Sequence, residues 1–430
     1  MEQDIKYDCK KKHFNIAVIG GGPSGMIAAG RAAQFGLKVV LIEKNELLGK
    51  KLLITGKGRC NLTHYQFDKH RLISNYGKKG RFLYSAIEYF GVLQVLEFFK
   101  RRGLQWNVER GHRVFPKNGD ARDVLKVLQN FLKDGNVSVR HNSKVMDIIK
   151  KNDFPERFEI TTGKEKIFSD CLIICTGGKS YPQTGSTGDG YVWAKKFGHT
   201  IVKLLPALNP VKTSELWVKN LQGLTLKNVS IKLYFEGKKK DERFGEMLFT
   251  HFGISGPIVM DISKHIGILL KEGKIKIWLD LKPALNFKKL DERIQRDFNK
   301  FKGRMFKNSL GELLPKSMIE VIINLSGIKS DKKVDYISRE ERKRMLHLIK
   351  ELELTPTGLL GYKWSVVTYG GIDLREVNPD TMGSKKVSNL FFAGEILDLD
   401  GPSGGFNLQE CWSTGYLAGE CAARRSKIIS

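Results

Sequence analysis

The hydrophobic positions near the start of the chain predict a strand, a helix and a second strand. Residues 16–19 and 39–42 are short apolar runs, which are typical of buried parallel strands. Between the two runs, small side chains recur at three- and four-residue spacing, from Gly25 to Ala33. Such a stripe lets a helix pack closely on a sheet. Residues 15–44 are therefore expected to form one βαβ unit.

The glycine spacing in the first turn of this unit is that of a dinucleotide site. Gly20, Gly22 and Gly25 give G-x-G-x-x-G, where the glycines permit a tight turn, close approach of a pyrophosphate and helix–strand contact. Glu43 follows the second strand, where a carboxylate can accept both ribose hydroxyls. An ordinary glycine-rich turn is the alternative. These residues leave nicotinamide and flavin dinucleotides open, because both contain ADP.

The segment 48–63 is rich in glycine and cations, so we expect it to be irregular and to lie on the crevice side of the sheet. Lys51, Lys57 and Arg59 can reach a phosphate. Cys60 lies among these cations, which should lower its pKa. A small buried packing residue is the alternative for Cys60.

The remaining pattern predicts further elements at both ends of the chain. We expect an amphipathic helix over 82–102, a hairpin over 105–116 and a helix over 120–132. A β-meander over 137–168 and a buried parallel strand over 171–175 follow. A polar loop over 180–191 then covers a cofactor. Strands over 366–371 and 389–394 end in glycine. Gly404 and Gly405 then open a long helix, whose face of small residues includes Gly415 and Gly419. Its N-terminus suits the anionic end of a reduced flavin.

The pattern of apolar and charged residues changes near Pro206, and the earlier pattern resumes near residue 362. We expect a first part of a dinucleotide domain over 1–205, an inserted domain over 206–361 and the second part over 362–430. The insertion combines strands (224–237, 274–281) with basic helical segments (287–304, 338–354). Within it, Ser255 can cap a helix that offers its N-terminus to a ligand, although a plain joint between loop and helix explains the segment equally well.

The large positive net charge of this chain is unusual for an enzyme that acts on a small molecule. Its net charge is +27, with about +7 in residues 61–122 and about +12 in residues 203–360. Such an excess suits a polyphosphate partner, and a basic proteome or a solvated surface is the alternative. No apolar run reaches the length of a membrane span, and the first residues lack the apolar core of a signal peptide, so we expect a cytoplasmic protein. The six cysteines show no disulfide or metal spacing and are expected to be reduced thiols.

Together, the segments GGGPSGMIAAGRAA, GKKLLITGKGRCNLT, ICTGGKSYPQTGSTGDGY, THFGISGP, VTYGGID and FFAGEILDLDGPSGGFNLQECWSTGYLAG resemble the BaiN/RdsA-type family of FAD-dependent oxidoreductases. The likeness spans residues 15–424 in order. It implies an α/β, glutathione-reductase-like FAD-binding Rossmann domain formed by both chain ends, with an inserted β-barrel plus helical domain.

The resemblance also implies which residues surround FAD. They are Gly20, Gly22, Pro23, Ser24, Gly25, Glu43, Lys44, Lys51, Gly58, Arg59, Cys60, Asn61, Val145, Thr176, Gly177, Gly178, Gly394, Glu395, Asp400, Gly404, Gly405, Phe406, Asn407 and Leu408. Family members usually have tyrosine where Phe406 stands, so any role of that hydroxyl is absent here. Only one full fingerprint is present, so NAD(P)H is expected to visit the flavin transiently.

Known members of the family act on steroid enones of bile acids or on uridine of large-subunit ribosomal RNA. Both substrates have a C=C conjugated to a carbonyl, so a hydride goes from the flavin to the β carbon and a proton to the α carbon. The charge favours ribosomal RNA. The alternatives are a small-molecule oxidoreductase, such as a steroid enone reductase or an amine or amino-acid oxidase, and a non-catalytic RNA-binding flavoprotein. The candidate proton donors are Cys60 and His251, and we expect neither a metal nor a membrane partner.

Overall fold

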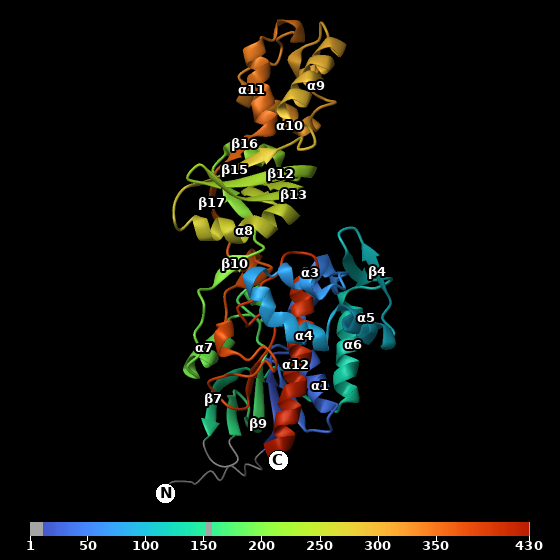
Figure 1. The fold of residues 1–430 in the computed structure, drawn as a ribbon, viewed down its shortest axis with the longest axis vertical. Helices are drawn as coiled ribbons and strands as arrows, with labels where there is room; N and C mark the ends of the chain where they lie inside the picture. The colour runs from blue at the N-terminus through green and yellow to red at the C-terminus, as the bar shows by residue number, and fades with distance from the viewer. Residues whose placement is uncertain (1–11, 152–156, 430) are drawn as a thin grey trace. The chain divides into compact units, whose positions relative to one another are not determined.

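The computed structural model describes residues 12–151 and 157–429. The chain forms two compact units (Figure 1): unit 1 combines the chain up to Leu205 with the chain from Val367 onward, and unit 2 is Pro206–Val366. The boundaries lie at 205/206 and 366/367, whereas the sequence analysis placed them at 205/206 and 361/362. Unit 1 is thus built from both ends of the chain.

A parallel sheet forms the centre of unit 1. Strand β1 (Lys12–Ile19) lies between β2 (Val39–Ile42) and β9 (Lys166–Ile174), and both run parallel to it. Val18 of β1 is opposite Leu41 of β2, and neither side chain is exposed. Such uninterrupted apolar strands are typical of a sheet that is covered on both faces. The predicted strands over 16–19 and 39–42 are confirmed.

The edges of this sheet correct the predicted meander. β6 (Ser138–Arg140) pairs in parallel with β2, because helix α6 (Ala121–Asp134) precedes it and returns the chain to the same direction. β7 (Val145–Lys151) and β8 (Arg157–Thr162) do form an antiparallel pair, and β8 continues onto β9. The meander therefore contains β7, β8 and β9 but not β6.

β9 is a single strand where the sequence analysis expected the end of the meander and then a separate strand over 171–175. Its first half pairs with β8, and its second half pairs with β19 (Leu390–Phe392), which runs parallel to it. The change of partner along one strand explains why its alternating first half and apolar second half look like separate elements. β19 brings the end of the chain into the same sheet as its beginning.

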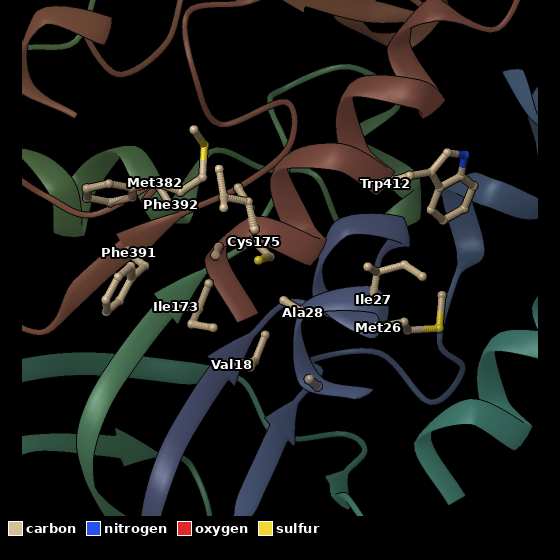
Figure 2. Packing of buried hydrophobic residues seen from close by; sticks show 14 of the residues in the cluster. Val18, Met26, Ile27, Ala28, Ile173, Cys175, Met382, Phe391, Phe392 and Trp412 are labelled. Atoms are coloured by element: carbon tan, nitrogen blue, oxygen red, sulfur yellow. The ribbon is translucent and has the colours of Figure 1, made fainter. Parts of the chain in front are cut away.

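Helices α1 (Pro23–Ala33) and α12 (Phe406–Ile429) contact each other through glycine. A Cβ on Gly415 or Gly419 would lie 2.4 or 2.3 Å from a backbone carbonyl oxygen of α1. Figure 2 shows the core around this contact, with the fully buried Trp412 of α12 on its edge. The predicted small-residue face thus brings two helices together at backbone distance.

The helix predicted over 82–102 is two helices. α4 (Tyr84–Tyr89) ends at Phe90, and α5 (Val92–Arg101) begins after Gly91, which caps it. The apolar positions keep their spacing across the break, so the pattern alone does not reveal it. No single helix of the described residues is long and apolar enough to cross a membrane, although Gly77–Tyr89 and Val92–Arg101, bent by 41°, pass together on length and composition.

Short elements complete unit 1. They are α2 (Lys50–Ile54), the 3₁₀ turn η1 (Thr55–Gly58), β3 (Thr63–His64), α3 (Lys69–Ser74), η2 (Gly77–Leu83), β4 (Trp106–Glu109), β5 (Arg113–Pro116), η3 (Pro182–Thr184), α7 (Asp189–Lys196), β18 (Val367–Tyr369) and η8 (Leu374–Glu376). β4 and β5 confirm the hairpin predicted over 105–116, and α6 confirms the helix predicted after Asp120. α2 and η1 correct the expectation that 48–63 is irregular, and α7 begins inside the predicted loop 180–191.

Unit 2 contains one curled sheet of seven strands, in the order β16, β15, β12, β13, β14, β11, β17. The edge strands β16 (Leu352–Leu354) and β17 (Pro356–Leu359) are consecutive and separated only by Thr355. The chain therefore passes from one edge of the sheet to the other through a single residue, so the sheet curls back on itself. The inner strands are β11 (Val211–Thr213), β12 (Thr225–Phe235), β13 (Lys238–Thr250), β14 (Gly253–Ser255) and β15 (Ile275–Asp280).

Four helices belong to unit 2: α8 (Pro257–Leu269), α9 (Phe287–Lys300), α10 (Lys316–Ser326) and α11 (Arg339–Lys350). The N-cap of α8 is Gly256, with φ +94°, and not Ser255, which ends β14. Ser255 is held in the ladder with β13, so its hydroxyl does not cap the helix. The segment predicted as helical over 338–354 ends instead in β16.

Candidate functional site

The first glycine turn joins β1 to α1 and leaves one open position. A Cβ on Gly20 would lie 2.5 Å from the carbonyl oxygen of Cys175, and one on Gly25 would lie 1.9 Å from that of Gly20. A Cβ on Gly22 would meet no heavy atom within 4 Å. Gly22 caps α1, Pro23 follows, and no side chain caps the helix. Its first backbone N–H groups are thus available to an anion.

The second glycine turn follows β9 and contains an unsatisfied polar atom. The Oγ1 of Thr176 is buried and has no hydrogen-bond partner. Gly177 has φ +69°, and a Cβ on Gly178 would lie 2.3 Å from the Oγ1 of Thr368. A buried hydroxyl without a partner is costly, so this atom indicates a polar ligand at the turn.

Glu43 is fixed by backbone donors at the end of β2. Its Oε2 accepts a hydrogen bond from the Gly21 N–H at 2.7 Å, and its Oε1 accepts from the Asn45 N–H at 2.8 Å. The carboxylate is therefore oriented beside the first glycine turn, and its remaining lone pairs can accept ribose hydroxyls. The neighbouring Lys44 instead pairs with Asp189, at 2.7 Å.

Lys51 and Glu395 form the centre of a polar network. The Nζ of Lys51 lies 2.6 Å from the Glu395 Oε2 and donates to the Ser180 hydroxyl at 2.5 Å. The Oε1 of Glu395 accepts from Ser180 at 2.6 Å and from the Thr368 N–H at 2.8 Å. The sequence analysis named Lys51 and Glu395 but missed Ser180 and Thr368, because no motif marks their contact. Glu395 thus positions the Lys51 ammonium. A phosphate that bound this ammonium would share it with the Glu395 carboxylate.

The N-terminus of α12 rests on β3. Gly404 and Gly405 have φ +115° and +103°, and a Cβ on Gly405 would lie 2.3 Å from the backbone of Thr63. The ring of Phe406 stacks on His64, with centroids 4.4 Å apart. The Nδ1 of His64 lies 3.2 Å from the Gly404 carbonyl oxygen. Burial lowers the pKa of His64, which favours the neutral imidazole with Nδ1–H as the donor.

Other side chains hold the loop before α12. The amide of Asn407 accepts from the Gly401 N–H and donates to the Gly401 carbonyl, both at 2.9 Å. The Tyr76 hydroxyl donates to the Phe406 carbonyl at 2.7 Å. Lys79 pairs with Asp398 at 2.5 Å. The side chain of Asn407 is therefore occupied in shaping the loop, and Tyr76 and Lys79 are supports that the sequence analysis did not identify.

Glu410 is a buried acid on the second turn of α12. Its side chain is 2 % exposed, and its Oε1 has no hydrogen-bond partner. Burial raises the pKa of Glu410 well above its ordinary value, and the charges of Glu395 and Asp400 raise it further. The sequence analysis missed this residue. A charged residue within a helix face of small and apolar residues was the available signal.

The predicted chemistry of Cys60 is wrong. Its side chain has no exposed surface, and burial raises its pKa to about 12, against a hydrogen bond with Thr55 that lowers it. The neighbouring cations do not lower the pKa because they face away, with Arg59 paired to Glu109 and stacked over the ring of Phe115 at 4.1 Å. Cys60 is thus a core residue in this structure, and Arg59 is an exposed one.

The other predicted FAD residues take several positions in unit 1. Asn61 accepts from the Val114 N–H at 3.2 Å, and Gly58 has φ +87° in the η1 turn. A Cβ on Gly394 would lie 2.5 Å from the Ser24 hydroxyl, so these two residues touch. The remaining ones are Val145, buried at the start of β7, Leu408, which packs against the core, and the half-buried Asp400.

His251 lies in unit 2, between β13 and β14. Its side chain is exposed, and its ring meets that of Phe252 edge to face at 4.9 Å. The two candidate proton donors therefore belong to different units.

The described residues of unit 1 fit a dinucleotide. The open position at Gly22, the uncapped start of α1 and the unpartnered Thr176 hydroxyl are what a pyrophosphate needs between two glycine turns. Within residues 12–151 and 157–429, no three His, Cys, Asp or Glu side chains are grouped to hold a metal ion. Cys60, Cys171, Cys175, Cys411 and Cys421 are free thiols, and Cys9 lies outside the described residues.

Comparison with known proteins identifies relatives along almost the whole chain. The family model described as HI0933-like protein Rossmann domain matches residues 14–421. A 3-dehydro-bile acid Δ4,6-reductase of Clostridium scindens is 32% identical over 413 residues, which are 95% of this chain and 99% of that protein. A ribosomal RNA dihydrouridine synthase of Haemophilus influenzae is 29% identical over 411 residues, which are 95% of this chain and 98% of that protein.

A solved structure shares the fold. The open conformation of a flavocytochrome c3 fumarate reductase matches with a TM-score of 0.53 and 15% identity, over 96% of this chain and 79% of that one. At this identity the match concerns the fold alone, which is an α/β FAD-binding fold of the Rossmann type.

Proposed function

The chain belongs to the HI0933-like Rossmann family of FAD-dependent oxidoreductases, and from this membership we propose that it reduces a uridine of large-subunit ribosomal RNA to dihydrouridine. The reaction adds a hydride to the β carbon and a proton to the α carbon of a C=C conjugated to a carbonyl. NAD(P)H is the proposed source of the hydride, and the cytoplasm is the proposed location. Bound FAD supplies the hydride transfer between the two.

The residues of unit 1 have separate roles in this proposal. The uncapped start of α1 at Gly22 holds the pyrophosphate, and the fixed carboxylate of Glu43 accepts the ribose hydroxyls. The ion pair of Lys51 and Glu395 presents hydrogen-bonding groups to the sugar chain of the cofactor. The N-terminus of α12 at Gly405 adds a partial positive charge that stabilises an anion.

Charge is the observation that carries the choice of RNA. If every Asp and Glu were paired with one Lys or Arg, 27 cations would still have no acidic partner. A steroid gains nothing from these charges, whereas each phosphate neutralised adds salt-dependent affinity. A base inside folded RNA must also be single-stranded or flipped, which costs a few kcal/mol. Phosphate contacts through residues 61–122 and the basic insertion would offset that cost.

The proton donor is proposed from the two candidates named in the sequence. A donor must reach the α carbon within hydrogen-bond distance. The side chain of Cys60 presents no surface, whereas the imidazole of His251 is exposed. We therefore favour His251, and the two variants His251→Ala and Cys60→Ala test it.

A direct test follows the hydride. Protein loaded with FAD is reduced anaerobically with NADH or NADPH and then mixed with unmodified large-subunit ribosomal RNA or with a steroid enone. We expect reoxidation of the flavin and formation of dihydrouridine with RNA only. Reoxidation by the enone with no reaction of RNA would refute the proposal. In cells, deletion should remove a ribosomal dihydrouridine, provided that no second enzyme makes it.

A second candidate function is the reduction of a small-molecule enone. The observation in its favour is that the bile acid reductase is 32% identical to this chain, against 29% for the RNA-modifying relative. An enone reductase predicts little dependence of substrate affinity on salt. A non-catalytic RNA-binding flavoprotein instead predicts RNA binding without turnover of NAD(P)H. The anaerobic experiment separates all three.

A further inference from the structure

Two loops of unit 2 are joined into one surface, which we call the paired-loop tip. It consists of residues 302–308, after α9, and 328–336, before α11 (Figure 1). The Phe306 N–H donates to the Lys332 carbonyl at 2.8 Å, and the Val334 N–H donates to the Arg304 carbonyl at 3.0 Å. Because backbone hydrogen bonds cross between the loops, the surface is held in one arrangement.

Buried apolar side chains also fix the paired-loop tip to the rest of unit 2, and a hydrogen bond to a carboxylate joins its two loops. The side chains of Phe306, Ile328 and Val334 are 0 %, 2 % and 4 % exposed. The Asp335 carboxylate accepts from the Gly303 N–H at 2.9 Å, so one of its two acids is used to tie the loops together. The tip is thus a preorganised part of the fold, and ordering it costs little when a partner binds.

The exposed side chains of the tip are mostly cations. Lys302, Arg304, Lys307, Lys329 and Lys333 are all exposed, and within the described parts of the chain none of them has an acidic partner. Lys332 pairs with Glu341 at 2.8 Å. With Asp331 and Asp335 as the tip's acids, its net charge is +4. Three acids near the tip are already paired with cations: Asp291 and Asp297 of α9, and Glu312 between α9 and α10.

An aromatic ring lies among these cations. Tyr336 is 72% exposed and is the last residue of the short turn η6 (Val334–Tyr336), which begins next to Lys333. Met305 is 44% exposed on the opposite loop. Proteins bind single-stranded nucleic acids with a positively charged groove and aromatic side chains on which bases stack. A membrane-binding surface would instead present a broad apolar face, which two such side chains do not make.

We propose that the paired-loop tip binds a single-stranded segment of RNA, with phosphates on its five cations and a base stacked on Tyr336. The proposal rests on the proposed function in taking RNA as the substrate class. In this proposal the RNA is bound by a part of unit 2 that contains none of the predicted FAD residues.

The test compares two triple variants of the full, FAD-loaded protein. Lys302→Ser, Arg304→Ser and Lys307→Ser together remove three tip cations. The matched control removes three exposed lysines of unit 1, with Lys126→Ser, Lys133→Ser and Lys164→Ser. Binding of a fluorescent single-stranded fragment of large-subunit ribosomal RNA is measured against salt. We expect the slope of log K against log salt to become less steep by about 2 in the tip variant, from about 0.7 per phosphate, and to stay the same in the control.

A single substitution tests the stacking separately. Tyr336→Ala should weaken binding of the fragment roughly tenfold while the salt slope stays constant, because stacking is not screened by salt. All variants should keep the flavin absorbance and the unfolding temperature of the wild type. Equal slopes for the tip variant and the control, with unchanged affinity of Tyr336→Ala, would overturn the proposal.

Two further outcomes separate this proposal from the proposed function. If the tip variants lose RNA binding and the wild type reduces no uridine, the tip stands and the proposed function fails. If the wild type reduces uridine and the tip variants bind and react equally well, the tip proposal fails and the function stands. Binding to phosphatidylserine vesicles is measured last, for the wild type and the tip variants. Tip variants that lost vesicle binding but kept RNA binding would overturn the RNA assignment.

Discussion

Replacing Glu410 with glutamine should make the stability of unit 1 less dependent on pH. Glu410 is 2 % exposed on α12, its Oε1 has no partner, and its pKa is raised, first by burial and then by the charges of Glu395 and Asp400. The folded protein therefore keeps a proton that the unfolded chain loses above its ordinary pKa of about 4.3. Glutamine has nearly the same shape and no proton to lose.

The sign and the size follow from proton linkage. A folded pKa above the unfolded one gives stability that is fully present below the unfolded pKa and is lost as pH rises toward the folded pKa. In that window the folded state binds one proton more, so the free energy of unfolding falls by about 1.4 kcal/mol per pH unit. Relative to Glu410→Gln, the wild type should thus lose stability steadily as pH rises from the unfolded pKa toward the folded one, by about 1.4 kcal/mol for each pH unit of that window.

The assay is urea unfolding of both proteins at saturating FAD, from about pH 5 to about pH 8. Contributions from unit 2 are common to both proteins, so the difference between them reports the substitution. Glu46→Gln, at an exposed position, is the control and should give no such slope. A difference between wild type and Glu410→Gln that stays constant across this range would refute the argument that Glu410 is protonated in the folded state.

Four other predictions concern single residues. Gly22→Ala should fold normally, because its Cβ meets no atom, yet weaken FAD binding at least roughly tenfold in a fluorescence titration; a pyrophosphate needs that space. Gly25→Ala should instead lower the free energy of unfolding by about 1–3 kcal/mol or more, because its Cβ would clash at 1.9 Å. Cys60→Ala should leave the pH profile of turnover unchanged, since a thiol with a pKa of about 12 does not titrate near neutrality, and loss of a limb of the profile would contradict this. His251→Ala should slow product formation without changing the unfolding temperature, because the side chain is exposed, and unchanged turnover would remove His251 from the mechanism.

The elements that the sequence predicted well are those fixed by local physics. The unit of β1, α1 and β2 has its apolar runs, glycines and small-residue helix within thirty residues, so each signal supports the next. The division of 82–102 was missed because Gly91 interrupts the helix while the apolar spacing continues across it. The pairing of β6 was missed because strand order depends on the crossover through α6, which periodicity does not encode.

The candidate site divides in the same way. Gly20, Gly22 and Gly25 follow from spacing, because backbone geometry alone requires them. The network around Glu395 depends on Ser180 and Thr368, which are 215 and 27 residues away from it, and no local pattern marks such contacts. For Cys60 the error was of another kind. The sequence analysis assumed that cations next to Cys60 in sequence also lie next to its thiol in space. In the fold, the side chain of Arg59 points outward and that of Cys60 lies in the core.

Substrate choice has to come from outside the features that we propose to hold FAD. In the proposed site, the glycine turns, Glu43 and the start of α12 would act through backbone groups and one carboxylate, and they would serve a steroid enone or a uridine equally. The charge excess is the feature that differs in its consequences. If about six phosphates are neutralised, log K for RNA should fall with log salt at a slope of roughly −4. Removing three cations of the paired-loop tip should leave a slope of roughly −2, so these three cations would account for about half of the salt-dependent affinity. A wild-type slope near zero would reject RNA as the substrate whatever the tip variants do, because the charge would then bind no phosphate.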